Sequence, residues 1–133
     1  MRVLVCLLAL SGLSSPVLAE TPADFLAAYA QQAKAANPGF VRLSAERGQQ
    51  FFAKTHGKEW SCSSCHTKNP AGAGKHVVTN KLIDPMAPAV NPLRFTRPAK
   101  VEKWFKRNCN DVLGRACTAQ EKGDALAYLM TVR

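Results

Sequence analysis

The feature that most constrains this chain is a C-S-S-C-H run at residues 62–66. Its spacing lets both thiols reach the two vinyl groups on one edge of a porphyrin, while the next residue presents its imidazole to the iron. The C-x-x-C-H pattern is the attachment signature of covalently bound haem. We therefore expect one haem c, attached through Cys62 and Cys65, with His66 as the proximal iron ligand.

Two other kinds of site use a C-x-x-C pair, and the rest of the sequence disfavours both. A structural zinc site has four ligands, commonly completed by a second C-x-x-C or a closely spaced pair of histidines. Cys109 and Cys117 do not have that spacing, and no such histidine pair is present. A thioredoxin-like redox pair occurs in a βαβ context, whereas the surroundings of residues 62–66 have helical patterns.

The N-terminus has the features of a secretory signal peptide. A basic start is followed by an apolar run from Val3 to Leu13 and then by small residues up to Ala19. The run is too short to span a bilayer, which takes about 20 residues, so we expect cleavage after Ala19. This predicts a signal peptide, residues 1–19, and one periplasmic domain, residues 20–133, without stable membrane insertion.

The net charge of the chain indicates which kind of binding partner it favours. It carries 18 Lys and Arg against 9 Asp and Glu, a formal net charge of +9, and a basic surface favours acidic partners. Nucleic acid is a poor candidate for an exported protein whose lysines are scattered without an arginine-rich run. No Ser/His/Asp set or phosphate-binding loop is visible in the sequence. We expect a monomer that docks briefly, and in a salt-sensitive way, to an acidic redox partner.

Capping residues and apolar periodicity predict four helices. They cover about 22–36 after a Thr21 cap, about 44–55 from a Ser44 cap, about 96–111, and a segment that starts at the capping box 118–121. The second and fourth predicted helices are expected to cross near Gly48. The fold should be all-α, a class I cytochrome c-like core around the haem with an extra N-terminal helix.

Residues 67–95 are rich in Gly and Pro and show little helical pattern. A segment of this length without regular structure is unusual in a compact domain. A large apolar cofactor explains it, because the segment can fold around the haem.

The residue opposite His66 decides what such a haem does. A strong second ligand, commonly Met, suits electron transfer, whereas a weak one leaves room for small molecules. Met86 lies between prolines in the segment 83–88, a form typical of a ligand loop. The other formal candidates, interpreted as a core methionine and two solvated histidines, are Met130, His56 and His76.

The third predicted helix offers a less usual ligand. Four residues that recur at i, i+3, i+4 and i+7 are Val101, Trp104, Phe105 and Asn108. They share one helix face, so Asn108 is expected to point inward, where a buried amide needs a partner. That partner is either a helix-end carbonyl or the haem iron, and the spacing leaves both open.

The cysteines that remain after signal cleavage also need partners, because free thiols are unfavourable in an oxidising compartment. With Cys62 and Cys65 bonded to haem, a disulfide between Cys109 and Cys117 would leave none free. It would fix the end of the third predicted helix and the direction of Asn108. A redox-active role for the pair is the alternative.

The segment V-E-K-W-F-K-R-N-C-N at residues 101–110, followed by G-R-A-C-T at 114–118, closely resembles the sphaeroides haem protein family. The similarity extends from Ser44 through the haem motif and residues 83–95 to the C-terminus. Members of that family are small high-spin monohaem cytochromes c. The resemblance implies that Asn108 is the distal haem ligand and that Cys109 and Cys117 form a disulfide beside it.

The resemblance also implies a function. It predicts that oxygen and nitric oxide bind at the reduced haem and that a dihaem cytochrome c supplies electrons. Redox activity towards oxygen, nitric oxide or peroxide is compatible with this, as is gas sensing or storage without turnover. Met86 stands where the family has a non-ligating apolar residue, so a His/Met electron carrier using Met86 is the alternative.

Overall fold

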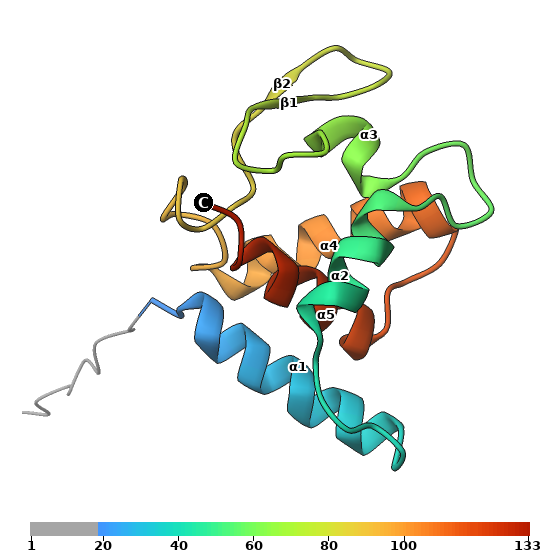
Figure 1. Ribbon diagram of the computed structural model, residues 1–133, viewed down its shortest axis with the longest axis vertical. Helices are drawn as coiled ribbons and strands as arrows, with labels where there is room; N and C mark the ends of the chain where they lie inside the picture. Colours follow the sequence, from blue (N-terminus) through green and yellow to red (C-terminus); the bar gives the residue numbers. More distant parts are fainter. Residues whose placement is uncertain (1–18) are drawn as a thin grey trace, which may run out of the picture.

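The computed structural model describes residues 19–133, so the predicted signal peptide lies outside the described residues except for Ala19. The described chain forms five helices and one small hairpin: α1 (Pro22–Ala36), α2 (Ala45–Ala53), α3 (Cys62–His66), β1 (Gly74–Lys75), β2 (Leu82–Ile83), α4 (Pro98–Leu113) and α5 (Ala119–Leu129) (Figure 1). The predicted N-terminal helix is present as α1. Within residues 19–133, no helix is both long enough and apolar enough to cross a membrane.

Side-chain caps start the helices where the sequence predicted. At α1, α2 and α5, the hydroxyl of the cap accepts a hydrogen bond from the backbone N–H three residues on; these caps are Thr21, Ser44 and Thr118. Such bonds satisfy N–H groups that have no partner within the helix. α4 begins at Pro98 and ends at Leu113, and it is capped by Gly114, whose φ of 72° lies in the left-handed region that stops a helix.

The core lies where α1 and α2 pack against α5. Its buried side chains are Phe25, Tyr29, Phe52, Phe95, Val101, Leu126, Tyr128 and Leu129. α2 crosses α5 at Gly48, where an added methyl group would overlap the backbone of Asp124. The predicted crossing near Gly48 is therefore confirmed, and it requires the glycine.

Residues 67–97 connect α3 to α4 and contain no regular structure beyond β1 and β2. The two strands pair antiparallel, with Gly74 opposite Ile83. The sequence predicted neither these strands nor α3, because such short elements leave no periodicity to detect. In Figure 1, α3 and the hairpin lie together at the opposite end of the molecule from α1.

Candidate functional site

α3 consists of the five residues of the C-x-x-C-H motif, so both thiols and His66 come from one short helix. Cys62 and Cys65 are half-buried and form no disulfide. Burial raises the pKa of the Cys62 thiol to about 11. A reactive redox pair has a lowered thiol pKa, so these surroundings do not resemble those of a thioredoxin-like site.

The backbone turns sharply directly after His66. Thr67 has φ 64° and ψ 167°, a region that residues other than glycine occupy only at a cost. Its hydroxyl donates to the carbonyl oxygen of Asn69 at 2.7 Å and accepts from the Asn69 N–H at 3.2 Å. Gly74 then brings β1 onto α3, since a methyl group at Gly74 would overlap the Cys65 carbonyl. These contacts hold the motif against the hairpin.

The imidazole of His66 is in a form that can bind a metal. Burial, with a smaller contribution from the charge of Arg94, lowers the pKa of His66 to about 4. The ring is therefore neutral at physiological pH, the form that coordinates metal ions. Its Nδ1 is buried without a hydrogen-bond partner among the described residues. Buried polar atoms in proteins are nearly always hydrogen-bonded, so this nitrogen is an exception that needs an explanation.

The buried face of α4 is rotated slightly from the predicted one. Its buried residues are Val101, Cys109 and Val112, and its half-buried ones are Phe105, Asn108 and Leu113. Trp104, which was predicted to share this face, is 42% exposed. On the buried side, Phe105 packs edge-on against Tyr29, with 5.9 Å between ring centroids, and Cys109 is held in a disulfide.

Asn108 lies one turn after Trp104, on the flank of this buried face. It is half-buried, and no hydrogen bond between described residues involves its side-chain amide. The end of α4 that carries Asn108 reaches the loop leading into α3: a Cβ at Gly114 would lie 2.9 Å from Cε of Lys58. This contact places the C-terminal end of α4 beside the loop that leads into the motif.

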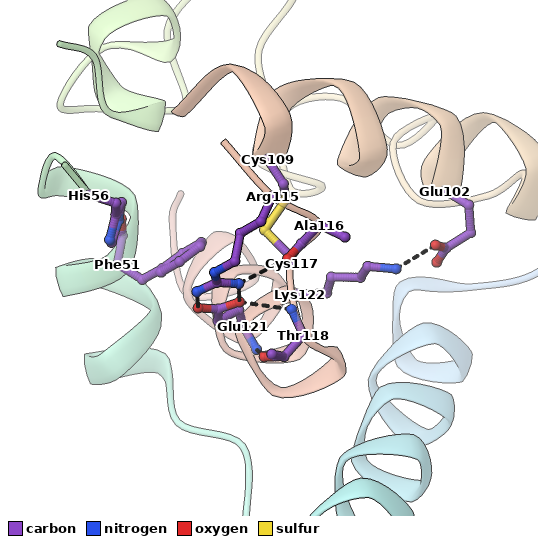
Figure 2. Close-up of a disulfide and its surroundings, with 10 residues drawn as sticks. All are labelled: Phe51, His56, Glu102, Cys109, Arg115, Ala116, Cys117, Thr118, Glu121 and Lys122. Atoms are coloured by element: carbon purple, nitrogen blue, oxygen red, sulfur yellow. Dashed lines mark hydrogen bonds and ion pairs between the residues drawn. A yellow bond between two sulfur atoms is a disulfide. The ribbon is translucent and has the colours of Figure 1, made fainter. Parts of the chain in front are cut away.

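The disulfide between Cys109 and Cys117 is present, as predicted, with 5.5 Å between the two Cα atoms (Figure 2). Both residues are buried. The bridge joins the residue after Asn108 to the start of α5. Beside it, the Arg115 guanidinium pairs with Glu121 at 2.7 Å, a contact that Figure 2 also shows. The turn from α4 to α5 is thus closed by a covalent bond and an ion pair.

The other sequence candidates occupy different surroundings. Met86 is half-buried and, like Cys62, packs against the core cluster. Met130 packs against the same cluster, which agrees with its interpretation from the sequence as a core methionine. The two histidines are more enclosed than predicted: Nε2 of His56 lies 2.8 Å from the Phe51 carbonyl oxygen, and Nδ1 of His76 accepts two backbone N–H bonds from the turn that follows it.

Sequence reasoning missed three residues of this region, Thr67, Gly74 and Arg94. Thr67 and Gly74 act through backbone geometry, which has no sequence pattern beyond the presence of one glycine. Arg94 is a single charge in a loop, and only its partial burial and its effect on His66 distinguish it from other arginines.

Known proteins resemble this chain along most of its length. Residues 38–129 match a family model described as a domain of unknown function, DUF1924. Cytochrome c'' from Methylophilus methylotrophus is 47% identical over 107 residues, which cover 77% of this chain and 74% of that protein. Cytochrome c-type protein SHP from Cereibacter sphaeroides is 45% identical over 123 residues, 88% of this chain and 90% of that protein. The chain belongs to the SHP and cytochrome c'' family.

Solved structures of the SHP and cytochrome c'' family share this fold. The crystal structure of oxidised cytochrome c'' from Methylophilus methylotrophus has a TM-score of 0.77 at 43% identity, covering 84% of this chain and 94% of that one. The structure of oxidised SHP, described as an oxygen-binding cytochrome c, has a TM-score of 0.74 at 43% identity, covering 84% and 96%. The predicted family and the all-α monohaem cytochrome fold are therefore confirmed.

Membership of the SHP and cytochrome c'' family implies a covalently bound haem c, and the residues of α3 fit one. Cys62, Cys65 and His66 supply the two thiols and the imidazole that attachment needs from a single helix. The partnerless ring nitrogen of His66 is consistent with a further group in this site.

Proposed function

We propose that this protein is an exported haem c protein that binds a diatomic gas and exchanges electrons with another cytochrome. In this proposal Cys62 and Cys65 hold one haem by thioether bonds, His66 is the proximal ligand, and the Asn108 amide is a weak distal ligand. Residues 20–133 would work in the periplasm after removal of the signal peptide.

The observation that carries the proposal is the placement of Asn108. Asn108 is half-buried, and its amide makes no hydrogen bond to another described residue, so its oxygen would be free to bind a haem iron on this side of α4. The disulfide beside Asn108 limits how far this end of α4 can move. The description of the related SHP as an oxygen-binding cytochrome c gives independent support.

The chemistry of an amide ligand explains how such a site would respond to reduction. The haem iron, when bound, supplies the redox couple and the position where a gas molecule binds. An amide oxygen is a hard, neutral and weak donor, which suits ferric iron better than ferrous iron. We expect Asn108 to leave on reduction and to become a hydrogen-bond donor for the incoming gas. A solution structure of the related cytochrome c'' likewise addresses haem-ligand detachment in that protein.

The alternative is a His/Met electron carrier that uses Met86. Met86 belongs to the long loop and packs against the core cluster. Its side chain is therefore engaged with apolar neighbours, whereas the Asn108 amide has no partner within the described residues. This difference favours Asn108.

Replacing Asn108 by Ala in the haem-loaded protein tests the proposal. We expect an altered ferric absorption spectrum and binding of nitric oxide to the ferric protein that is faster by about tenfold, the equivalent of removing a competitor worth about 1.4 kcal/mol. Asn110→Ala, at an exposed position on the same helix, is the matched control.

An Asn108→Ala protein that keeps the wild-type spectrum and binding rate would refute the proposal. Loss of a thioether-to-iron charge-transfer band in Met86→Leu would then establish the alternative. Steady-state consumption of oxygen or nitric oxide with a supplied reductant would separate turnover from sensing or storage.

A further inference from the structure

Arg94 is a half-buried guanidinium that has no carboxylate partner within the described residues. Its Nε donates to the carbonyl oxygen of Pro85 at 2.9 Å, and its Nη2 donates to the carbonyl oxygen of Asp84 at 2.6 Å. The ion pairs formed within residues 19–133 involve other cations. Since a guanidinium has five N–H donors, an edge of this one stays free to bind an anion.

The surroundings make this free edge unusual for a surface arginine. Burial lowers the pKa of the Arg94 guanidinium, and the charge of Asp84 opposes that effect only in part. A cation that is partly removed from water is unfavourable unless an anion accompanies it. The chain nevertheless keeps Arg94 hydrogen-bonded to the segment directly before Met86, which packs, like Cys62, against the core cluster.

The loop around Arg94 is built to hold it in place. The Asn91 amide donates to the same Pro85 oxygen at 3.3 Å. The next residue, Phe95, has φ 55°, a left-handed conformation that is strained for a bulky side chain. Its ring is buried and lies 6.4 Å from that of Phe105 on α4. Strain of this kind persists only where the surroundings fix it, and it clusters at functional sites.

We propose that Arg94 is the receptor for a propionate of the haem, which its free guanidinium edge binds. The inference rests on the proposed function to the extent that haem occupies the site. Haem carries its two vinyl groups and its two propionates on opposite parts of the ring. Cys62 and Cys65 would hold the vinyl side through thioether bonds, which would leave the propionates for other residues to bind, and the planar fork of an arginine matches a carboxylate.

The same contact would connect the haem to the long loop. Arg94 already holds the carbonyl groups of Asp84 and Pro85, directly before Met86. A bound propionate would therefore fix the Met86 segment as well as the porphyrin. A cation near the haem also favours the reduced state, because it opposes the extra positive charge of ferric iron.

Three variants of the haem-loaded protein test this inference: Arg94→Gln, Arg94→Lys and, as a control, Arg97→Gln. Arg97 is exposed, and its side chain does not cap α4, so this variant removes one charge nearby without touching the loop. The readouts are the propionate bending band in the resonance Raman spectrum and the midpoint potential.

We expect Arg94→Gln to shift the band and to lower the potential further than Arg97→Gln does. Arg94→Lys should keep most of the potential while still shifting the band, because a lysine retains the charge and loses the two-pronged contact. If Arg94→Gln matches Arg97→Gln in both readouts, Arg94 only clamps the loop and the inference is overturned.

Arg94→Lys decides the question if the glutamine variant does not take up haem. A shifted band in the lysine variant supports the inference, and a wild-type band overturns it. The band reports the propionate whichever residue is the distal ligand. An unchanged Asn108→Ala spectrum would therefore refute the proposed function and leave the Arg94 result standing.

Discussion

Gly74 is the residue on which the packing of the hairpin against the C-x-x-C-H motif depends. A methyl group there would overlap the carbonyl oxygen of Cys65 and crowd the Cα of His66. On the other side of His66, Thr67 holds a strained turn. Two backbone features, neither of them a candidate ligand, therefore set the position of the residues proposed to bind haem.

Gly74→Ala should lower the fraction of protein that carries covalent haem, because β1 must move away from α3 to admit the methyl group. Overpacking of this kind costs about 1–3 kcal/mol, so the urea midpoint of unfolding should also fall. Haem content by absorbance and unfolding by circular dichroism measure the two effects.

Gly72→Ala is the matched control for this change, since a Cβ there meets only the Asn69 carbonyl oxygen at 3.4 Å, an ordinary contact. Equal haem content in the two alanine variants would contradict the role given to Gly74.

At the scale of single residues, the sequence predicted residues whose side-chain chemistry is distinctive and missed residues whose role depends on backbone conformation or burial. Asn108 and the Cys109–Cys117 pair could be singled out because an inward amide and paired cysteines carry a chemical signature. The contribution of Thr67 depends on a positive φ. That of Arg94 depends on partial burial, and neither property can be obtained from a local run of residues.

At the scale of elements, a hydrogen-bonded cluster attaches α1 to α4 and α5. The Tyr29 hydroxyl donates to the Glu102 carboxylate at 2.6 Å. Lys122 pairs with the same carboxylate, as Figure 2 shows, and its Nζ lies 5.5 Å from the centre of the Tyr29 ring. Burial pushes the pKa of Glu102 upward, but the hydrogen bonds from Lys122 and Tyr29 outweigh it and hold the pKa below its ordinary value.

Tyr29→Phe should reduce the free energy of unfolding by about 1–2 kcal/mol at neutral pH, since it removes a buried hydroxyl bonded to a charged group. Because the folded-state pKa of Glu102 is lowered, its contribution is present above the ordinary glutamate value of 4.5 and is lost as the pH falls through the folded value. Urea unfolding at neutral pH and near pH 3 should therefore show a smaller difference in acid.

Tyr128→Phe is the control for this change. Tyr128 is also buried, but its hydroxyl has no hydrogen bond within residues 19–133. A difference between wild type and Tyr29→Phe that is the same at both pH values would contradict the role given to Glu102.

The elements themselves were predictable where capping chemistry marks their ends. Caps at Thr21, Ser44 and Thr118 placed α1, α2 and α5 correctly. Periodicity placed α4 correctly but assigned Trp104 to its buried face. Residues spaced by three and four share one side of a helix, but this spacing does not decide how far the buried side extends around the helix.

At the scale of the whole molecule, the formal net charge of +9 is the property most relevant to a redox partner. α4 alone presents several exposed cations, Lys100, Lys103, Lys106 and Arg107. Positive potential of this kind speeds the encounter with an acidic protein and fixes its orientation more than it tightens the complex.

Electron transfer from an acidic cytochrome should therefore slow as salt is added. The screening length falls from about 10 Å at 0.1 M to about 3 Å at 1 M, so the bimolecular rate constant from stopped-flow mixing should drop by about tenfold or more over this range. An uncharged small-molecule reductant is the control and should show a flat response. A flat response with the acidic protein would remove the electrostatic argument for docking.

Under the proposed function, one pair of cysteines must be oxidised and the other pair must stay reduced. Cys109 and Cys117 are joined to each other, whereas Cys62 and Cys65 must still be reduced thiols when haem arrives. An oxidising compartment would close either pair, and a premature bond within α3 would block cofactor insertion. Biogenesis of this protein therefore requires a reductant that acts selectively on the α3 pair and spares the bridge at the end of α4, which its burial helps to protect.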